Sequence, residues 1–151
     1  MLNYLKSLQV ICRALLLGQV MFLAVAIYLK YNNIFGGAMR EYDKVLQLIA
    51  LGVSFVFVWT GFRLFNKKMA EIKAGNINFD EKLSRYRSAA VMQWAMTEAA
   101  SILTIVCFMI TGNYAFSGLT VVLIFIFSGY YPLKARLVTQ MGLSSEEAEK
   151  L

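Results

Sequence analysis

Residues 88–133 read SAAVMQWAMTEAASILTIVCFMITGNYAFSGLTVVLIFIFSGYYPL and carry one charge, the carboxylate of Glu98. A bilayer core about 30 Å thick is crossed by roughly 20 helical residues. The stretch is therefore long enough for two crossings, and a Gly-Asn pair at 112–113 is a turn signal near its middle. It predicts two adjacent transmembrane helices, over residues 88–111 and 114–133.

Two further apolar stretches, residues 10–29 and 45–62, have the length of a membrane span. The 151 residues are 59% hydrophobic and only 16% charged, whereas a soluble domain is about 45–50% apolar and about 25% charged. A soluble four-helix bundle also needs polar outer stripes, which these segments lack. We therefore expect an all-α fold, an integral membrane bundle of four transmembrane helices that forms a single domain over residues 1–151.

The basic residues are distributed unequally between the two sides of these spans. Of the 15 Lys and Arg residues, 12 lie in the N-terminal segment, the loop 63–87 or the tail 134–151, and only Lys30, Arg40 and Lys44 lie on the other side. The positive-inside rule then predicts that both termini and the central loop are cytoplasmic. The same rule accounts for the net charge of +6, so we expect no nucleic-acid partner.

The central loop 63–87 is predicted to be a cytoplasmic helical hairpin. Good helix formers fill residues 64–74, Gly75 is a natural stop, and Asn78 with Glu81 resembles a capping box. Its basic side chains predict contact with anionic lipid headgroups or with a partner, although a topology signal alone would also explain them. The contact residues we expect are Lys67, Lys68, Lys73, Arg85 and Arg87.

The two halves of the chain share a weak pattern. An Arg precedes a Gln by six residues at Arg13 and Gln19, and again at Arg87 and Gln93. The pattern is consistent with a parallel repeat of two helical hairpins, related by an axis along the membrane normal. If the repeat holds, Gln19 and Gln93 lie at equal depth.

Glu98 is the residue that the apolar stretch does not explain. An acid at the centre of a membrane helix costs roughly 2.5–3.5 kcal/mol on insertion scales, so we expect it to face the bundle. Polar residues on three spans fall near its depth and predict an interhelical polar seam of Glu98, Gln93, Gln19, Ser54 and Ser101. This seam is either a proton- or cation-binding site or a set of hydrogen bonds that hold the helices together.

The chain offers little for catalysis. It has no His, and Cys12 and Cys107 belong to segments that we expect near opposite faces of the bilayer, so neither a disulfide nor a metal site is expected. A phosphate loop and a nucleophile–base pair are both lacking. We therefore predict a protein that is not an enzyme and binds no cofactor.

Several motifs resemble those of a known group. Residues 86–98 (YRSAAVMQWAMTE), the Ile-Thr-Gly-Asn run ending at Asn113, the Pro-Leu-Lys at 132–134 and an acidic tail are similar to a group of small, uncharacterised four-helix bacterial membrane proteins. The resemblance implies a four-helix fold and the bacterial inner membrane, and it implies no activity. A fainter analogy, carried by Glu98-Ala-Ala, is to the helical hairpins of rotary ATPase proteolipid subunits.

Two functions are consistent with these features, and lipid binding between the helices is a third. The first is a non-enzymatic accessory or structural membrane protein that acts through oligomerisation or a membrane-protein partner. The second is a small proton- or cation-coupled transporter or conductor that uses Glu98. A chain this short would need to oligomerise to enclose a path.

Overall fold

The computed structural model describes residues 3–34, 40–75 and 77–149. Four long helices lie side by side: α1 (Asn3–Tyr31), α2 (Asp43–Ala74), α3 (Phe79–Thr111) and α4 (Tyr114–Ser128). A short 3₁₀ helix, η1 (Arg40–Tyr42), precedes α2, and two short helices, α5 (Lys134–Met141) and α6 (Ser145–Glu149), follow α4. The described residues are almost entirely helical, so the expected all-α bundle is confirmed.

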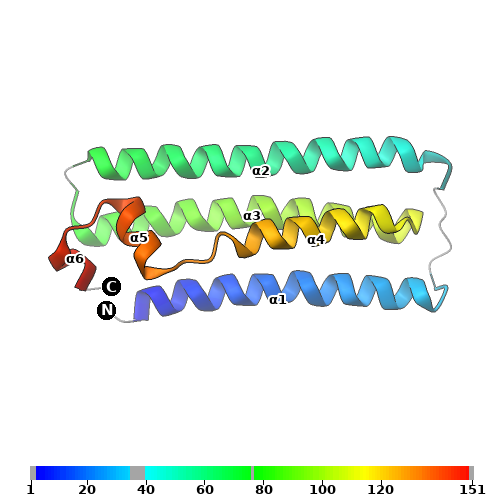
Figure 1. Ribbon diagram of the computed structural model, residues 1–151, viewed down its shortest axis with the longest axis horizontal. Helices are drawn as coiled ribbons and strands as arrows, with labels where there is room; N and C mark the ends of the chain where they lie inside the picture. The colour runs from blue at the N-terminus through cyan, green and yellow to red at the C-terminus, as the bar shows by residue number, and fades with distance from the viewer. Residues whose placement is uncertain (1–2, 35–39, 76, 150–151) are drawn as a thin grey trace.

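Helix α3 is the helix against which the other three long helices pack. Helix α3 packs against α1, α2 and α4, whereas α1 and α2 lie on opposite sides of the α3–α4 pair (Figure 1). The start of α1, the α2–α3 connection and α5–α6 share one end of the bundle, which we call the proximal end (Figure 1). The α3–α4 turn lies at the other end, the distal end. Because α3 and α4 pack directly and α1 and α2 do not, the two halves of the chain are not packed alike.

Two residues, Gly112 and Asn113, form the turn between α3 and α4 at the distal end. Gly112 ends α3 with a positive φ of 71°, and its N–H donates to the Phe108 carbonyl. A left-handed residue that carried a Cβ would be strained here and would also meet the Lys30 ammonium group. Asn113 then caps α4, since its side chain accepts a hydrogen bond from the N–H of Ala115 at 2.9 Å.

Helix α4 is shorter than the expected span over residues 114–133. It ends at Ser128, Gly129 is its C-cap, and no helix resumes before Lys134. Pro132 explains the break, because proline disfavours helical backbone at the residue before it and cannot donate to a helix. With 15 residues, α4 extends only about 22 Å at 1.5 Å per residue.

The proximal ends of α2 and α3 form the helical hairpin that the sequence predicts over residues 63–87, but two details differ. Asn78 occupies the N-cap position of α3 without a side-chain hydrogen bond, and Glu81, the other member of the expected capping box, pairs with Arg85 at 2.6 Å. Leu64, whose apolar side chain predicts packing within the hairpin, is exposed. The neighbouring Phe65 is buried instead, and its ring meets Tyr86 edge-on with centroids 5.8 Å apart.

The bundle has two apolar cores. The proximal core centres on Trp94 and Phe127 and includes Leu8, Ile72 and Leu137. The distal core centres on Phe108 and Phe116. Between the two cores, every long helix contributes buried polar side chains, and this arrangement positions the candidate site.

Outward-facing surfaces are strongly apolar, above all on α1 and α2. Leu48 and Phe55 of α2 are 73% and 68% exposed, and Phe125 of α4 is 71% exposed. Helices α1, α2 and α3 are each long and apolar enough to cross a membrane, by length and composition. A water-soluble bundle would place polar residues on these faces, so the surface is that of a membrane protein.

Candidate functional site

A layer of buried polar side chains separates the two apolar cores. All its members are at most 3% exposed. They come from all four long helices, and we call them the polar layer: Gln19, Ser54, Thr97, Ser101, Thr104 and Thr120.

The hydroxyl groups of α3 mostly bond to their own helix. Thr97 donates to the Gln93 carbonyl at 3.1 Å, and Ser101 donates to the Thr97 carbonyl at 3.1 Å. One pair joins two helices, because the hydroxyl oxygens of Thr104 and Thr120 lie 2.7 Å apart. Back-bonding of this kind satisfies a hydroxyl in an apolar medium, so these residues need no ligand to be stable.

Gln19 and Ser54 behave differently. Both amide atoms of Gln19 and the hydroxyl of Ser54 are buried, and the described residues offer them no hydrogen-bond partner. A buried polar group without a partner costs roughly 1–3 kcal/mol. The polar layer therefore contains unsatisfied donors and acceptors on α1 and α2, on either side of the satisfied hydroxyls of α3.

Contacts at the helix ends define the depth of these residues. The Tyr4 hydroxyl donates to the Leu83 carbonyl, and Lys30 lies against Gly112. Each residue of α1 therefore lies level with the α3 residue whose number is 79 to 82 higher. Gln19 thus lies level with residues 98–101. This depth agrees with the expected seam but not with the internal repeat, which would have placed Gln19 level with Gln93.

Ser54 reaches the same depth from the other side. Gly61 of α2 packs on Met96 and on the Gln93 carbonyl of α3. Since the two helices are antiparallel, Ser54 lies level with residues 100–103. Of the expected seam, Gln19, Ser54 and Ser101 therefore meet at one depth in the bundle interior.

Glu98 lies at the edge of this layer. It is only partly buried. On one side of it the α3 surface is buried at Trp94 and Ile105, and on the other it is exposed at Ala95 and Ile102. Its carboxylate has no hydrogen bond or ion pair with any described residue. The expectation that Glu98 faces the bundle thus holds only in part, because a helical turn of 100° per residue carries it to the rim of the buried face.

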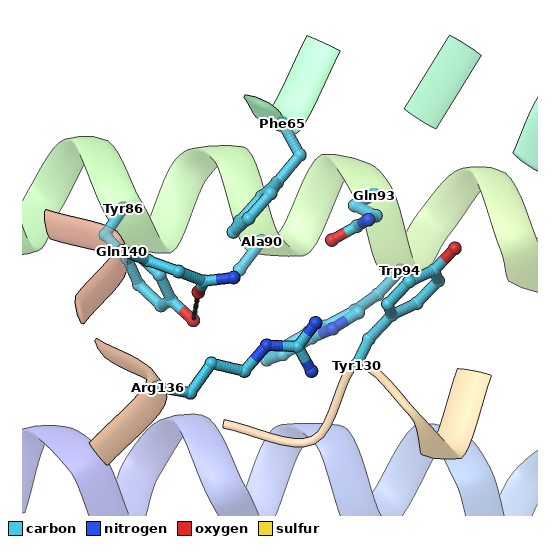
Figure 2. A pocket seen from close by; sticks show the side chains of 8 residues that line it. All are labelled: Phe65, Tyr86, Ala90, Gln93, Trp94, Tyr130, Arg136 and Gln140. Atoms are coloured by element: carbon cyan, nitrogen blue, oxygen red, sulfur yellow. Dashed lines mark hydrogen bonds between the residues drawn. The ribbon is translucent and has the colours of Figure 1, made fainter. Parts of the chain in front are cut away.

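Gln93 belongs to a separate polar cavity near the proximal end. The cavity has a volume of about 10 Å³ and lies between Gln93, Trp94 and Tyr130 on one side and Tyr86, Arg136 and Gln140 on the other (Figure 2). The Tyr86 hydroxyl is 3.5 Å from the Gln140 amide oxygen, and Arg136 donates to the Gly129 carbonyl. A cavity of about 10–15 Å³ with several polar neighbours has room for one water molecule.

Sequence reasoning missed the α5 side of this cavity. The sequence identified Arg136 only as one basic residue of the predicted cytoplasmic tail, and it assigned no role to Gln140. A signal was present, since the two are four residues apart and so share one face of a helix. That face lies beside α3 only because the chain leaves the helical path of α4 after Ser128 and α5 then crosses toward α2 (Figure 1), which the break at Pro132 permits.

The basic residues of the hairpin are engaged to different degrees. Lys67, Lys68 and Arg87 are exposed. Arg85 is also exposed but binds Glu81, and the stem of Lys73 packs beside Gly142 of the C-terminal segment. Lys82 joins α3 to α6, because its Nζ lies 3.0 Å from Glu147 Oε1.

Cys12 and Cys107 are free, buried thiols in different cores. Among residues 3–34, 40–75 and 77–149, no cluster of three Cys, Asp or Glu side chains is close enough to hold a metal ion.

By its fold and surface, the chain is an all-α bundle with a polar layer at mid-height and with three helices long and apolar enough to cross a membrane. Comparison with protein-family models, with curated protein sequences and with solved structures finds no match.

Proposed function

We propose that this chain is a non-enzymatic accessory protein of the bacterial inner membrane that assembles laterally with a second copy or with another membrane protein. Its proximal end, with both termini, would face the cytoplasm. Support for this orientation comes from the uneven distribution of basic residues. Support for the inner membrane is the resemblance to small four-helix bacterial membrane proteins.

The observation that carries the proposal is the position of Glu98. Its carboxylate lies at the bundle rim, at mid-height, without a partner among the described residues. An acid in this position is unfavourable by about 2.5–3.5 kcal/mol when it faces lipid. A donor from a neighbouring protein would remove much of this penalty, so association through this face is favoured.

The surface beside Glu98 suits close helix packing. Ala95 and Ala99 are exposed on the same outward side of α3, and their spacing places them one turn apart. Small residues four apart let two membrane helices approach closely, and polar side chains then add hydrogen bonds worth about 0.6 kcal/mol each. We call this surface, formed by Ala95, Glu98 and Ala99, the α3 outer face.

The proximal end supplies a second contact. Lys67, Lys68 and Arg87 are exposed there, without a carboxylate partner among the described residues. Beside a membrane, each such charge contributes about 1 kcal/mol to the attraction of anionic headgroups. We therefore expect the hairpin to hold anionic lipid, or the acidic surface of a partner, against the bundle.

Cysteine cross-linking in native membranes tests the assembly. In a background with Cys12→Ala and Cys107→Ala, Ala95→Cys should give a cross-linked product that Glu98→Gln weakens severalfold. Trp59→Cys is the matched control, because Trp59 is exposed on α2 and lies level with residues 95–98. The mass of the product distinguishes a second copy from another protein. Equal cross-linking at positions 95 and 59 would exclude the α3 outer face.

Transport of protons or cations through Glu98 is the second candidate. The observation that favours it is the polar layer, whose unsatisfied Gln19 lies level with residues 98–101. Purified protein in liposomes should then conduct protons or sodium ions, and Glu98→Gln should abolish the flux. Absence of flux in the wild type, or flux that the substitution leaves unchanged, would reject this candidate without affecting the assembly proposal.

A further inference from the structure

The distal end of the bundle carries a hollow of about 470 Å³, within the usual size range of ligand pockets. Its lining comes from the end of α1, the start of α2 and the α3–α4 turn: Lys30, Asp43, Thr111, Gly112, Asn113 and Tyr114. The hollow thus gathers residues from all four long helices, and two of them have opposite charges.

The two charges are not paired with each other. No described carboxylate oxygen lies within 4 Å of the Lys30 ammonium group, which rests against Gly112. One oxygen of Asp43 accepts from the Asn113 amide, and the Gln47 amide approaches the same oxygen at 3.4 Å. The other oxygen, Oδ1, is shielded from solvent and has no donor. The hollow is therefore lined by one cation and by a carboxylate whose second oxygen is unsatisfied but shielded from solvent, so a ligand must displace a neighbouring side chain to reach it.

An apolar groove begins one helical turn below this hollow and runs between α2 and α4. It consists of two hollows of about 170 Å³ each, which share Leu51 and Leu119. Gln47 and Ala115 line its distal part, and Val58 and Ile126 line its deepest part. From Gln47 to Val58 the groove extends about 16 Å at 1.5 Å per residue, close to half of a hydrocarbon core about 30 Å thick.

We propose that the distal hollow and the α2–α4 groove together bind one phospholipid whose headgroup contains a phosphate and a primary ammonium group. The phosphate would lie at Lys30, the ammonium group would donate to Asp43, and one acyl chain would fill the groove. The depth of the groove corresponds to one leaflet, as an acyl chain requires. This inference rests on the membrane placement in the proposed function, but not on the α3 outer face, which is a different surface.

The headgroup chemistry selects among common phospholipids. A primary ammonium group donates hydrogen bonds to a carboxylate, whereas a trimethylammonium group has no N–H to donate. A glycerol headgroup has hydroxyl groups that can donate to a carboxylate but no positive charge, so it leaves the charge of Asp43 uncompensated. We therefore expect phosphatidylethanolamine to bind more tightly than phosphatidylcholine or phosphatidylglycerol with the same acyl chains.

Native mass spectrometry of the purified full chain, titrated with each of these three lipids, tests the proposal. Wild type should retain phosphatidylethanolamine with about tenfold higher affinity than phosphatidylglycerol, the effect of one charge-assisted hydrogen bond. Asp43→Asn should remove this preference, and Lys30→Gln should weaken all three lipids. The matched controls are Asp80→Asn at the proximal end and Lys44→Gln, an exposed distal lysine outside the hollow.

A second pair of variants tests the groove. Ala115→Phe adds bulk inside it, whereas Val121→Phe enlarges a side chain on the opposite side of α4. Ala115→Phe should lower the affinity for every phospholipid about tenfold, and Val121→Phe should leave it unchanged. Equal retention of the three lipids by wild type, or no effect of Ala115→Phe, would overturn the proposal. So would loss of a dimer with Ala115→Phe at unchanged lipid binding, because a second copy would then occupy the groove.

Discussion

The hydroxyl oxygens of Thr104 and Thr120 lie 2.7 Å apart and join α3 to α4 between the two apolar cores. Both residues are fully buried. Each hydroxyl also lies within hydrogen-bond distance of a carbonyl of its own helix, at Ser101 and Phe116. Since a hydroxyl has one proton, one of them donates to the other while its partner donates to the backbone.

This arrangement predicts a measurable coupling between the two threonines. A double-mutant cycle with Thr104→Val and Thr120→Val, followed by unfolding in mixed micelles, should give a coupling free energy of about 0.6 kcal/mol. Thr139→Val is the control, because Thr139 is exposed and bonds only within α5. Strict additivity of the two valine substitutions would mean that this contact contributes nothing to stability.

At Gln19, unlike at the two threonines, an apolar substitution is expected to stabilise the fold. Its amide is buried and has no partner among the described residues, so replacing it by an apolar side chain of similar size removes an unmet desolvation penalty. Gln19→Leu should raise the free energy of unfolding by about 1 kcal/mol. Gln9→Leu should lower it by a similar amount, because the Gln9 amide donates to the Pro132 carbonyl at 3.1 Å.

Unfolding of both glutamine variants under one condition makes the comparison internal. A destabilised Gln19→Leu variant would contradict this account. It would show that the amide is satisfied in the membrane by a neighbour that the isolated chain does not provide.

The attachment of α6 should depend on pH. Glu147 accepts a hydrogen bond from the Ser144 N–H and binds Lys82, and these contacts lower the pKa of its carboxyl. A carboxyl whose pKa is lower in the folded state stabilises that state fully above its unfolded pKa, near 4.3. The contribution is lost as the pH falls through the folded value. Because the pair is near the surface, we expect less than about 1 kcal/mol.

Hydrogen exchange of the α6 backbone amides, corrected for intrinsic rates, measures this effect. Protection should be constant between neutral pH and about pH 5 and should decrease at lower pH. Glu147→Gln should show low protection at every pH, and Glu146→Gln, at an exposed neighbouring position, should behave as wild type. Protection that is independent of pH in wild type would exclude the Lys82–Glu147 contact as its cause.

Local patterns in the sequence were sufficient for the helices themselves. The long apolar stretches, the Gly112 turn and the stop at Gly75 all lie within a few residues of the features they specify. Two local predictions were less accurate. The fourth helix ends earlier than expected, because Pro132 acts on the turn before it. The capping box at α3 does not form, since the Asn78 side chain makes no cap hydrogen bond and Glu81 pairs with Arg85.

The sequence alone also predicted which polar residues could share one depth, because depth along a helix is a simple function of residue number. That prediction included Gln93, which lies in a separate cavity nearer the proximal end. The sequence did not determine how the helices are arranged around each other. Polar and apolar residues are not clearly separated on opposite faces of these four helices, so several spatial arrangements would be compatible with the sequence. Only the tertiary structure separates α1 from α2, encloses Gln19 and Ser54 without partners, and leaves Glu98 at the rim. The physical reason is that each side chain's environment depends on rotation about the helix axis and on neighbours far away in the chain, and neither is encoded by local spacing.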